Sequence, residues 1–514
     1  MGCADHATTR PERRYSGVPL GALGGLSHAP LRAVLSPPLG RTSAAHLTSA
    51  RGSFERTRVH APRPAPRNGG HSALYALRCR EAVAAAKILD PLIQHTWRGL
   101  TDHFVTPLGL PMDRVTIDKS GAIVERSVAT SPTNIGLYLA ALLVQRDRGA
   151  VPGPEARARV VTTLATLERL PKDSRGFLFN WYDASDGALR LQSGEGLDAS
   201  GVQRTANDGA FVSSVDNGNL MIALEGLRHG FRDDPAVTRT IDAVLTPMKL
   251  AFSEAFLETE TGSLAAGTLR LGYYVGADQR ELRTPHHYDR FGSEARSTVA
   301  LLEAEGYLPE GSLALLGERT SVAEAVVGEE RVRVFKAWDG GVFQWLLPNV
   351  LLGETELSGA MAQNHRGLVR LLVAGGKDGL PLAASASDLP DGRYEGKSGV
   401  PALSEDAEYV KGGTLTPHAL FLLSSIDPEI AARALSRLRA KYPDLFHEGL
   451  GFADSVDLDT GAVAHTVLAL DQLMSVVAGG GFGAHVQARV ASLAALPGGS
   501  GRSLKDVYAS VGPF

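Results

Sequence analysis

Cysteine is nearly absent from this chain of 514 residues, which has only Cys3 and Cys79. Two cysteines so far apart cannot build a disulfide framework or a cysteine-rich zinc site. This scarcity excludes iron–sulfur proteins and zinc ribbons. Long apolar runs are also missing, since no stretch approaches the ~20 apolar residues that a membrane span requires. We therefore expect no membrane span.

Lysine is absent from residues 1–70, where ten arginines face three acidic residues. The net charge of this segment is +7, which leaves −11 for the remainder of a chain whose total is −4. Nucleic-acid binding requires lysine and arginine concentrated on the folded domain. The acidic body therefore argues against a nucleic-acid partner.

The N-terminal segment also lacks periodic apolar residues and is rich in Arg, Pro and Gly, so we interpret residues 1–71 as a disordered tail. Residues 18–31 are interrupted by Gly, Ser, His and Pro and make a poor signal-peptide core, which favours a cytoplasmic location. The arginine-rich composition also suits a transit peptide or a wrongly assigned start codon. An extracytoplasmic location would follow if the start or the tail is mis-assigned.

From about residue 72 onward, apolar residues recur at helical spacing between loops that contain Gly or Pro. This pattern predicts one all-α domain over residues 72–500, with a few short strands and a C-terminal tail at residues 501–514. Such a helix count fits an (α/α)6 toroid, or six-hairpin barrel, in which six inner and six outer helices alternate and the loops at one end build a concave site. An irregular helical array fits the count equally well. The expected helices lie near residues 74–98, 133–148, 155–170, 217–229, 235–258, 293–305, 340–353, 357–374, 415–424, 428–440, 464–478 and 483–495.

Aromatic, amide and carboxylate side chains first come together at Asn180, Trp181 and Asp183. A sugar ring has apolar C–H faces for stacking and hydroxyl groups for polar acceptors, so this mixture suits a sugar. A buried Trp181 followed by an Asx-turn at Asp183 explains the same residues.

A second polar cluster precedes the helix expected near residues 217–229 and contains Asp216 and Asn219. Asp216 could simply be the N-cap of that helix. The density of polar side chains in front of an apolar helix is nevertheless what a toroid would place at its substrate site.

Glu294 belongs to a third cluster and is expected in the first turn of a helix capped by Gly292 or Ser293, where the helix dipole favours an acid. Helix initiation alone could account for it. Tyr288 and Asp289 precede it among two histidines and an arginine, and this concentration of titratable groups is typical of a lined cleft.

Two further stretches contain candidate sugar contacts. Trp338 and Gln344 flank a Gly-Gly pair that would allow close approach of a ligand, although packing in the core explains the aromatic residues equally well. Asp388 begins a long irregular stretch, and loops of this length in compact domains are usually functional or disordered.

Several motifs together resemble a known family, the glucoamylase-like bacterial proteins, which are largely of unknown function. Their relatives include endo-β-1,2-glucanases and the cyclisation domain of cyclic β-1,2-glucan synthases. The resemblance covers about residues 100–480. The motifs are Ser131-Pro132-Thr133-Asn134, Asn180-Trp181-Tyr182-Asp183, Ser214-Val215-Asp216-Asn217-Gly218-Asn219, Gly340-Gly341-Val342-Phe343, Asn364-His365, Thr416-Pro417-His418, Gly451-Phe452-Ala453-Asp454 and Leu468-Ala469-Leu470-Asp471-Gln472.

The resemblance implies the toroid, an oligo- or polysaccharide substrate of the β-glucan class, and glycoside chemistry with no metal and no cofactor. Glu294 occupies the place of an essential acid in these relatives, and Asp216 falls near a second acid. In the cyclising relatives a Ser-Glu-Ser sequence supplies a catalytic Glu, whereas this chain has Ala386 there and a shifted Glu405 nearby. Gln344 likewise stands where relatives usually have Glu.

We therefore expect glycoside hydrolysis with inversion, in which Glu294 is the acid and Asp216 orients or deprotonates water. A catalytically silent glycan-binding or scaffold protein, and a transglycosylase, are the alternatives. The expected substrate-binding residues are Asn180, Trp181, Asp183, Asn219, Tyr288, Asp289, Trp338, Gln344, Asp388 and Asp471.

Overall fold

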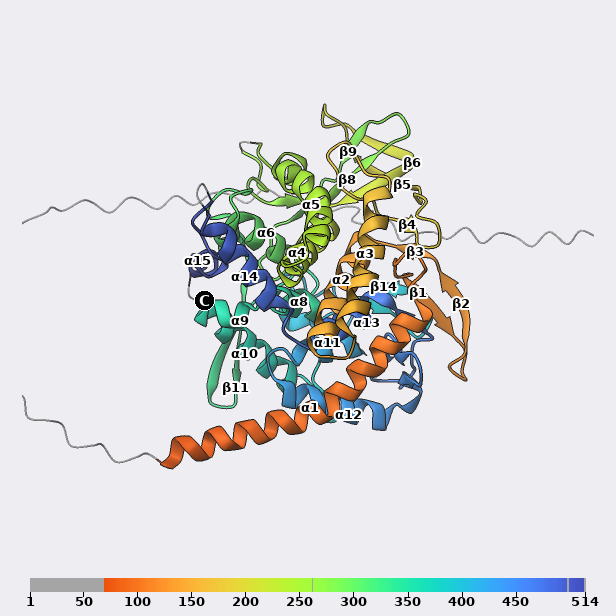
Figure 1. Ribbon diagram of the computed structural model, residues 1–514. Helices are drawn as coiled ribbons and strands as arrows, with labels where there is room; N and C mark the ends of the chain where they lie inside the picture. The colour runs from red at the N-terminus through yellow and green to blue at the C-terminus, as the bar shows by residue number, and fades with distance from the viewer. Residues whose placement is uncertain (1–68, 261, 497–498, 513–514) are drawn as a thin grey trace, which may run out of the picture. The chain divides into compact units, whose positions relative to one another are not determined.

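The structure is a computed structural model that describes residues 69–260, 262–496 and 499–512 (Figure 1). The expected N-terminal tail lies outside these residues except for its last three positions. The described residues from Glu81 onward form one compact unit. None of the described helices is both long enough and apolar enough to cross a membrane.

Six helices contact one another in a closed order. α2 packs on α4, α4 on α6, α6 on α8, α8 on α11, α11 on α13, and α13 returns to α2. Their bounds are α2 Pro132–Asp147, α4 Ser214–Gly230, α6 Ala295–Ala304, α8 Val342–Leu352, α11 Pro417–Leu423 and α13 Ala469–Val477.

Most of the remaining helices lie between these six along the chain, and several pack against them: α3 contacts α2, α5 contacts α4, α7 contacts α6 and α12 contacts α11. α14 packs on both α4 and α8. Their bounds are α1 Gly69–His103, α3 Gly153–Arg169, α5 Pro235–Phe256, α7 Ser312–Arg319, α9 Glu354–Leu357, α10 Gly359–Ala374, α12 Pro428–Lys441, α14 Phe482–Ala494 and α15 Leu504–Ala509.

The two groups of helices differ in burial, as their sequences require. α2 is apolar around its circumference and nearly all of its residues are buried, as expected of a helix with neighbours on every side. α3 buries only a stripe that includes Ala156, Val160, Leu164 and Leu167, which follows the 3.6-residue period of a surface helix. Local signals start both helices, since each has Pro in its first turn.

Glycine allows the closest helix contacts. A Cβ added to Gly136 of α2 would lie 2.9 Å from the Cα of Leu220 in α4. A Cβ on Gly218 of α4 would collide with the side chain of Thr298 in α6. These two glycines thus set the spacing of α2, α4 and α6.

Strands are more extensive than the sequence analysis expected, although most are short. β5, β6, β8 and β9 form a closed four-stranded barrel, visible as a group in Figure 1, and β1 lies between β19 and β2. β11 pairs with β12 in an antiparallel hairpin. The strands are β1 Arg114–Ile117, β2 Ile123–Ser127, β3 Ala129–Thr130, β4 Tyr182–Asp183, β5 Gln192–Leu197, β6 Gln203–Ser213, β7 Leu269–Arg270, β8 Gly272–Val275, β9 Glu281–Arg283, β10 His287–Tyr288, β11 Val322–Val327, β12 Glu330–Phe335, β13 Ser387–Asp388, β14 Tyr394–Glu395, β15 Thr414–Leu415, β16 Phe446–His447, β17 Gly451–Phe452, β18 Val456–Asp457 and β19 Thr466–Leu468.

The C-terminal segment corrects one expectation. Residues 501–514 were expected to be a tail, yet α15 forms there and buries Val507 and Tyr508. A capping box at Ser503 and Asp506 starts this helix. The Tyr508 hydroxyl donates a hydrogen bond to Glu354, which attaches α15 to α9.

Candidate functional site

Polar residues gather at the N-terminal ends of the six mutually contacting helices. Asp216 lies in the first turn of α4, Glu294 directly precedes α6, and Gln344 lies in the first turn of α8. His418 and Asp471 occupy the first turns of α11 and α13. Unpaired backbone N–H groups at helix N-termini favour negative charge, so these ends can hold carboxylates and the hydroxyl groups of a ligand.

Neither Asp216 nor Glu294 caps its helix through its side chain. Ser213 is the N-cap of α4, and its hydroxyl accepts a hydrogen bond from the backbone N–H of Asp216. Glu294 takes the N-cap position of α6 rather than the first turn, but its carboxylate makes no capping bond. Ser293 accepts the N–H of Ala295 instead. Helix initiation alone therefore does not account for either acid.

Glu294 has a strongly raised pKa. Burial, reinforced by the nearby charges of Asp339 and Asp216, raises the pKa of its carboxyl to about 7. Its Oε2 atom is buried and has no hydrogen-bond partner among the described residues. A carboxyl with this pKa carries a proton for about half of the time at neutral pH, as a general acid requires.

Tyr288 faces the same carboxylates. Burial raises the pKa of its hydroxyl well above the ordinary value, and the charges of Glu294, Asp216 and Asp339 raise it further. The pairing of β10 with β7 fixes its backbone, since Tyr288 lies opposite Leu269. The structure thus brings Glu294, Asp216, Tyr288 and Asp339 close enough to interact electrostatically, while the roles expected for the first three stay predictions.

Asp339 is an acid that the sequence analysis did not select. Its Oδ1 accepts the backbone N–H of Gly341 at 2.9 Å, and its Oδ2 accepts the Gln344 amide at 3.3 Å. Burial raises the pKa of Asp339 to about 6. Gln344 therefore supplies a donor to this carboxylate. The only sequence signal for Asp339 was its place before the Gly-Gly pair.

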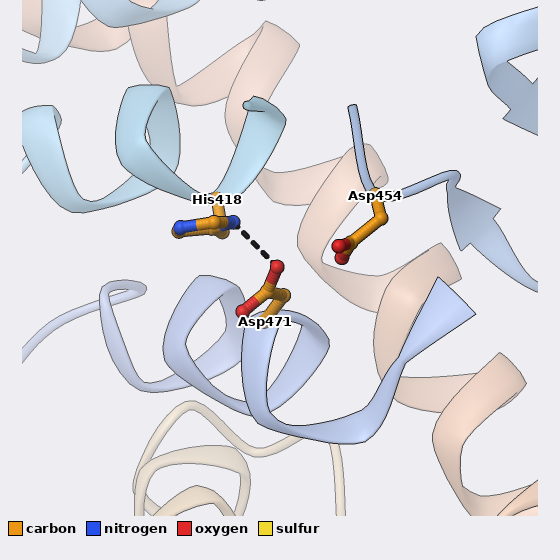
Figure 2. A group of neighbouring side chains, drawn as sticks. All are labelled: His418, Asp454 and Asp471. Carbon is orange, nitrogen blue, oxygen red and sulfur yellow. Dashed lines mark ion pairs between the residues drawn. The ribbon is translucent and has the colours of Figure 1, made fainter. Parts of the chain in front are cut away.

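A second cluster lies at the start of α11 and α13 (Figure 2). His418 Nδ1 lies 2.7 Å from Asp471 Oδ2, and Asp454 comes from the loop between β17 and β18. Burial lowers the pKa of His418 to about 4 and raises that of Asp471 to about 7. Burial raises the pKa of Asp454 as well, and repulsion from Asp471 adds to it. The imidazole is therefore neutral at pH 7.

Asp388 adjoins this second cluster. Its backbone N–H donates to Asp454 Oδ2 at 2.5 Å, and its own carboxylate lies 3.2 Å from Arg114. Burial raises the pKa of Asp388, whereas Arg114 opposes that change. Asp388 and Asp471 were expected from the sequence to contact sugar, whereas His418 and Asp454 were recognised only as parts of the family motifs.

Asp113 and Tyr394 connect the two clusters electrostatically. Burial raises the pKa of Asp113, and both Asp388 and Asp216 add to the effect. Asp113 lies just before β1, whose pairing with β19 places it next to the start of α13, and its backbone carbonyl accepts the N–H of Ala469. The hydroxyl of Tyr394 interacts with the carboxylates of the second cluster and of Asp113. The acids at the ends of α4, α11 and α13 thus interact with one another through Asp113 and Tyr394.

Polar and aromatic side chains form a connected group next to Tyr288 in the chain, which we call the rim: Asp289, Arg290, Trp338 and Glu405. Trp338 is 46% exposed and donates its indole N–H to Asp289 at 3.0 Å, while the Arg290 guanidinium lies 4.5 Å from its ring centroid. Glu405 forms an ion pair with Arg290 and accepts hydrogen bonds from Ser321. Glu405 is thus engaged in this rim and is poorly placed to serve as a free nucleophile.

The remaining sequence candidates make structural contacts. Asp183 accepts hydrogen bonds from the backbone and the hydroxyl of Ser185, so it forms the Asx-turn that was the alternative interpretation. Trp181 is half-buried, and Asn180 is buried with its backbone paired to Phe211. Asn219 donates to Thr133 at 3.3 Å and so links α4 to α2. Their roles in sugar binding stay predictions.

Solved structures share this fold at low sequence identity. An endo-β-1,2-glucanase of Talaromyces funiculosus, solved as a Glu-to-Gln mutant with β-1,2-glucan, matches with a TM-score of 0.65 and 13% identity, over 84% of this chain and 92% of that one. An endo-β-1,2-glucanase of Chitinophaga pinensis, in complex with sophorotriose and glucose, matches with a TM-score of 0.60 and 13% identity, over 83% and 98% of the two chains. A glucoamylase-like protein of Bacteroides caccae matches with a TM-score of 0.58 and 15% identity, over 83% and 99%.

One curated relative matches part of the chain. Cyclic beta-(1,2)-glucan synthase NdvB of Rhizobium meliloti is 33% identical over 157 residues, which are 30% of this chain and 5% of that protein. The chain thus spans a small part of the length of this relative. No family model matches the chain. These similarities confirm the resemblance to glucoamylase-like proteins, endo-β-1,2-glucanases and cyclic β-1,2-glucan synthases, and they confirm a predominantly helical fold.

Proposed function

We propose that this protein is a glycoside hydrolase that acts on a β-glucan with β-1,2 linkages, and that its alternating helices form an (α/α)6 toroid. The observation that carries the proposal is the buried carboxyl of Glu294, whose pKa is about 7 and which shares its surroundings with Asp216, Asp339 and Tyr288. The fold is shared with two endo-β-1,2-glucanases, which supports the substrate class.

In the proposed reaction, protonated Glu294 donates its proton to the glycosidic oxygen as the bond to the anomeric carbon breaks. The Asp216 carboxylate accepts a proton from the attacking water. Water approaches from the face opposite the leaving group, so the anomeric configuration inverts. Tyr288 and Asp339 supply further polar groups beside Glu294. The partly exposed ring of Trp338 offers a stacking surface for a sugar.

Replacing Glu294 by Gln tests the assignment of the acid. Glu294→Gln keeps the size of the side chain but removes the transferable proton, so we expect turnover of linear β-1,2-glucan to fall at least 1,000-fold, or ~4 kcal/mol in the barrier. A reducing-end assay measures the loss, and circular dichroism measures folding. Glu310→Gln is the matched control, because the Glu310 side chain is 82% exposed and lies outside the site.

Retained activity in Glu294→Gln would contradict the proposal. The configuration of the first product, followed by nuclear magnetic resonance, tests inversion separately. Release of a product with retained configuration would exclude the assignment of Asp216 as the base.

A silent glycan-binding protein is the second candidate, favoured by Ala386 and Gln344, which stand where relatives have carboxylates. Calorimetry with β-1,2-glucan distinguishes it, because binding without new reducing ends would support this candidate. A transglycosylase would instead release products longer than the substrate.

A further inference from the structure

The second cluster places three potential metal ligands close together. His418 from α11, Asp454 from the β17–β18 loop and Asp471 from α13 offer one ligand atom each, and these atoms all lie within 4.8 Å of one another. In Figure 2 the three side chains point toward a common centre. Each residue is at most 3% exposed.

The polar atoms of this cluster are incompletely satisfied. Nε2 of His418 and Oδ1 of Asp454 are buried without a hydrogen-bond partner among the described residues, whereas His418 Nδ1 and Asp471 Oδ2 form an ion pair at 2.7 Å. The carboxylate of the adjoining Asp388 is instead paired with Arg114. Buried polar atoms nearly always have a partner, so buried ring-nitrogen and carboxylate atoms that lack one in the same place point to a missing ligand.

We propose that His418, Asp454 and Asp471 bind a divalent transition-metal ion, with Zn²⁺ as the best match. One neutral imidazole and two carboxylates balance the charge of a divalent ion, and this mixture of nitrogen and oxygen ligands suits zinc better than calcium or magnesium. Zinc–ligand bonds of about 2.0–2.2 Å in tetrahedral geometry place the ligand atoms ~3.3–3.6 Å apart. The three ligand atoms lie within 4.8 Å of one another, so each needs to move by less than ~1 Å.

The surroundings of the three residues fit such a site. The backbone N–H of Asp388 holds Asp454 Oδ2, which orients its carboxylate as the hydrogen bonds around metal ligands usually do. Binding would connect α11, the β17–β18 loop and α13, and it would serve the structure of this end of the protein. This inference goes beyond the proposed hydrolysis and departs from the expectation of no metal.

Calorimetry with zinc chloride tests the site on the full chain after treatment with a chelator. We expect one Zn²⁺ per chain and an affinity at least 100-fold higher than in Asp454→Asn or Asp471→Asn. These variants remove a buried charge, so they should fold, and thermal unfolding without metal checks this. Asp459→Asn is the control, because its side chain is 75% exposed and lies outside the cluster, and it should bind like wild type.

Two results would overturn the inference. The first is wild-type protein that binds no Zn²⁺, or binds it no better than Asp471→Asn does. The second is stabilisation of the wild type by a β-1,2-glucan oligosaccharide but not by Zn²⁺, with loss of that effect in Asp471→Asn, because the cluster would then be a sugar contact. Neither measurement depends on hydrolysis, so the metal site and the proposed activity fail independently.

Discussion

At the scale of single residues, Glu294 owes its pKa to its surroundings more than to its place before a helix. An N-terminal helix end alone would lower the pKa of an acid. Burial outweighs that effect, and the charges of Asp339 and Asp216 reinforce it, so the pKa rises to about 7. A raised pKa leaves the carboxyl protonated below pH 7 and ionised above it.

The pH dependence of activity follows from the raised pKa of Glu294. If Glu294 is the acid, kcat/KM should fall as the pH rises through about 7. Asp339→Asn removes a like charge while keeping an acceptor for the N–H of Gly341. It should therefore lower the pKa of Glu294. The pH at which kcat/KM falls on the alkaline side should then decrease by on the order of 0.5–1 pH unit. Initial rates from pH 5 to 9 measure the shift.

Asp233→Asn provides the comparison, since its side chain is 91% exposed and its pH profile should match that of the wild type. An alkaline limb that stays in place, or moves to higher pH, in Asp339→Asn would show that Glu294 does not control it.

At the scale of elements, helix spacing determines whether the acids meet at all. Asp216 and Glu294 begin adjacent helices, and α4 is fixed against α2 through the close approach of Gly136 to Leu220. Gly136→Ala would gain about 1 kcal/mol in helix propensity. The added Cβ would lie 2.9 Å from Leu220 Cα and 3.3 Å from Ala223 Cβ, so α2 and α4 would have to separate. Overpacking costs typically ~1–3 kcal/mol, and we expect net destabilisation of about 1 kcal/mol.

Urea unfolding followed by circular dichroism measures this change. Gly153→Ala is the matched control, because nothing lies within 4 Å of its added Cβ and it begins the surface helix α3. Its stability should be equal or slightly higher. Equal stability of Gly136→Ala and the wild type would mean that this contact does not set the helix spacing.

Most helices could be predicted from the sequence, whereas several strands could not. Apolar periodicity located the helices to within a few residues at most ends, as for α5 at Pro235–Phe256 against residues 235–258. The β5–β6 pair was missed because its strands, such as Gln192–Leu197, contain Gly and polar residues with little alternation. The β11–β12 hairpin does alternate, most clearly in Glu330–Phe335, and that signal could have revealed it.

Some residues of the candidate site could likewise be selected from the sequence and others could not. Glu294 and Tyr288 could be selected because titratable residues are dense in one short stretch. The partners Asp339, His418 and Asp454 come from three other segments, and each looks like an ordinary loop or helix-start residue on its own. Only the mutual packing of α6, α8, α11 and α13 brings these segments to neighbouring helix ends.

At the scale of the whole molecule, one buried polar network joins the C-terminal helix to the helices behind the candidate site. Arg296 of α6 forms an ion pair with Glu354 of α9, and Glu354 also accepts the Tyr508 hydroxyl from α15. Arg296 also donates to the backbone carbonyls of Gln344 and Trp345 in α8. This network holds the first turns of α6 and α8 at a fixed distance, and these turns carry Gln344 and adjoin Glu294.

Glu354→Gln tests this network through its dependence on pH. Burial alone would raise the pKa of Glu354, but Arg296 outweighs it and the pKa falls to about 2. Because the pKa of Glu354 is lower in the folded state, its carboxylate stabilises the fold at pH values above its ordinary pKa of 4.5. This contribution to the free energy of unfolding is lost as the pH falls toward 2. We therefore expect Glu354→Gln to lose about 3–5 kcal/mol at pH 7, because Arg296 stays buried without its partner. The difference from the wild type in the free energy of unfolding should shrink below pH 4, as measured by urea unfolding across that range.

Glu356→Gln, in the same short helix, should lose less than about 1 kcal/mol because Glu356 is not part of the network. A loss in Glu354→Gln that is the same at pH 3 and pH 7 would mean that the carboxylate charge does not hold these helices together.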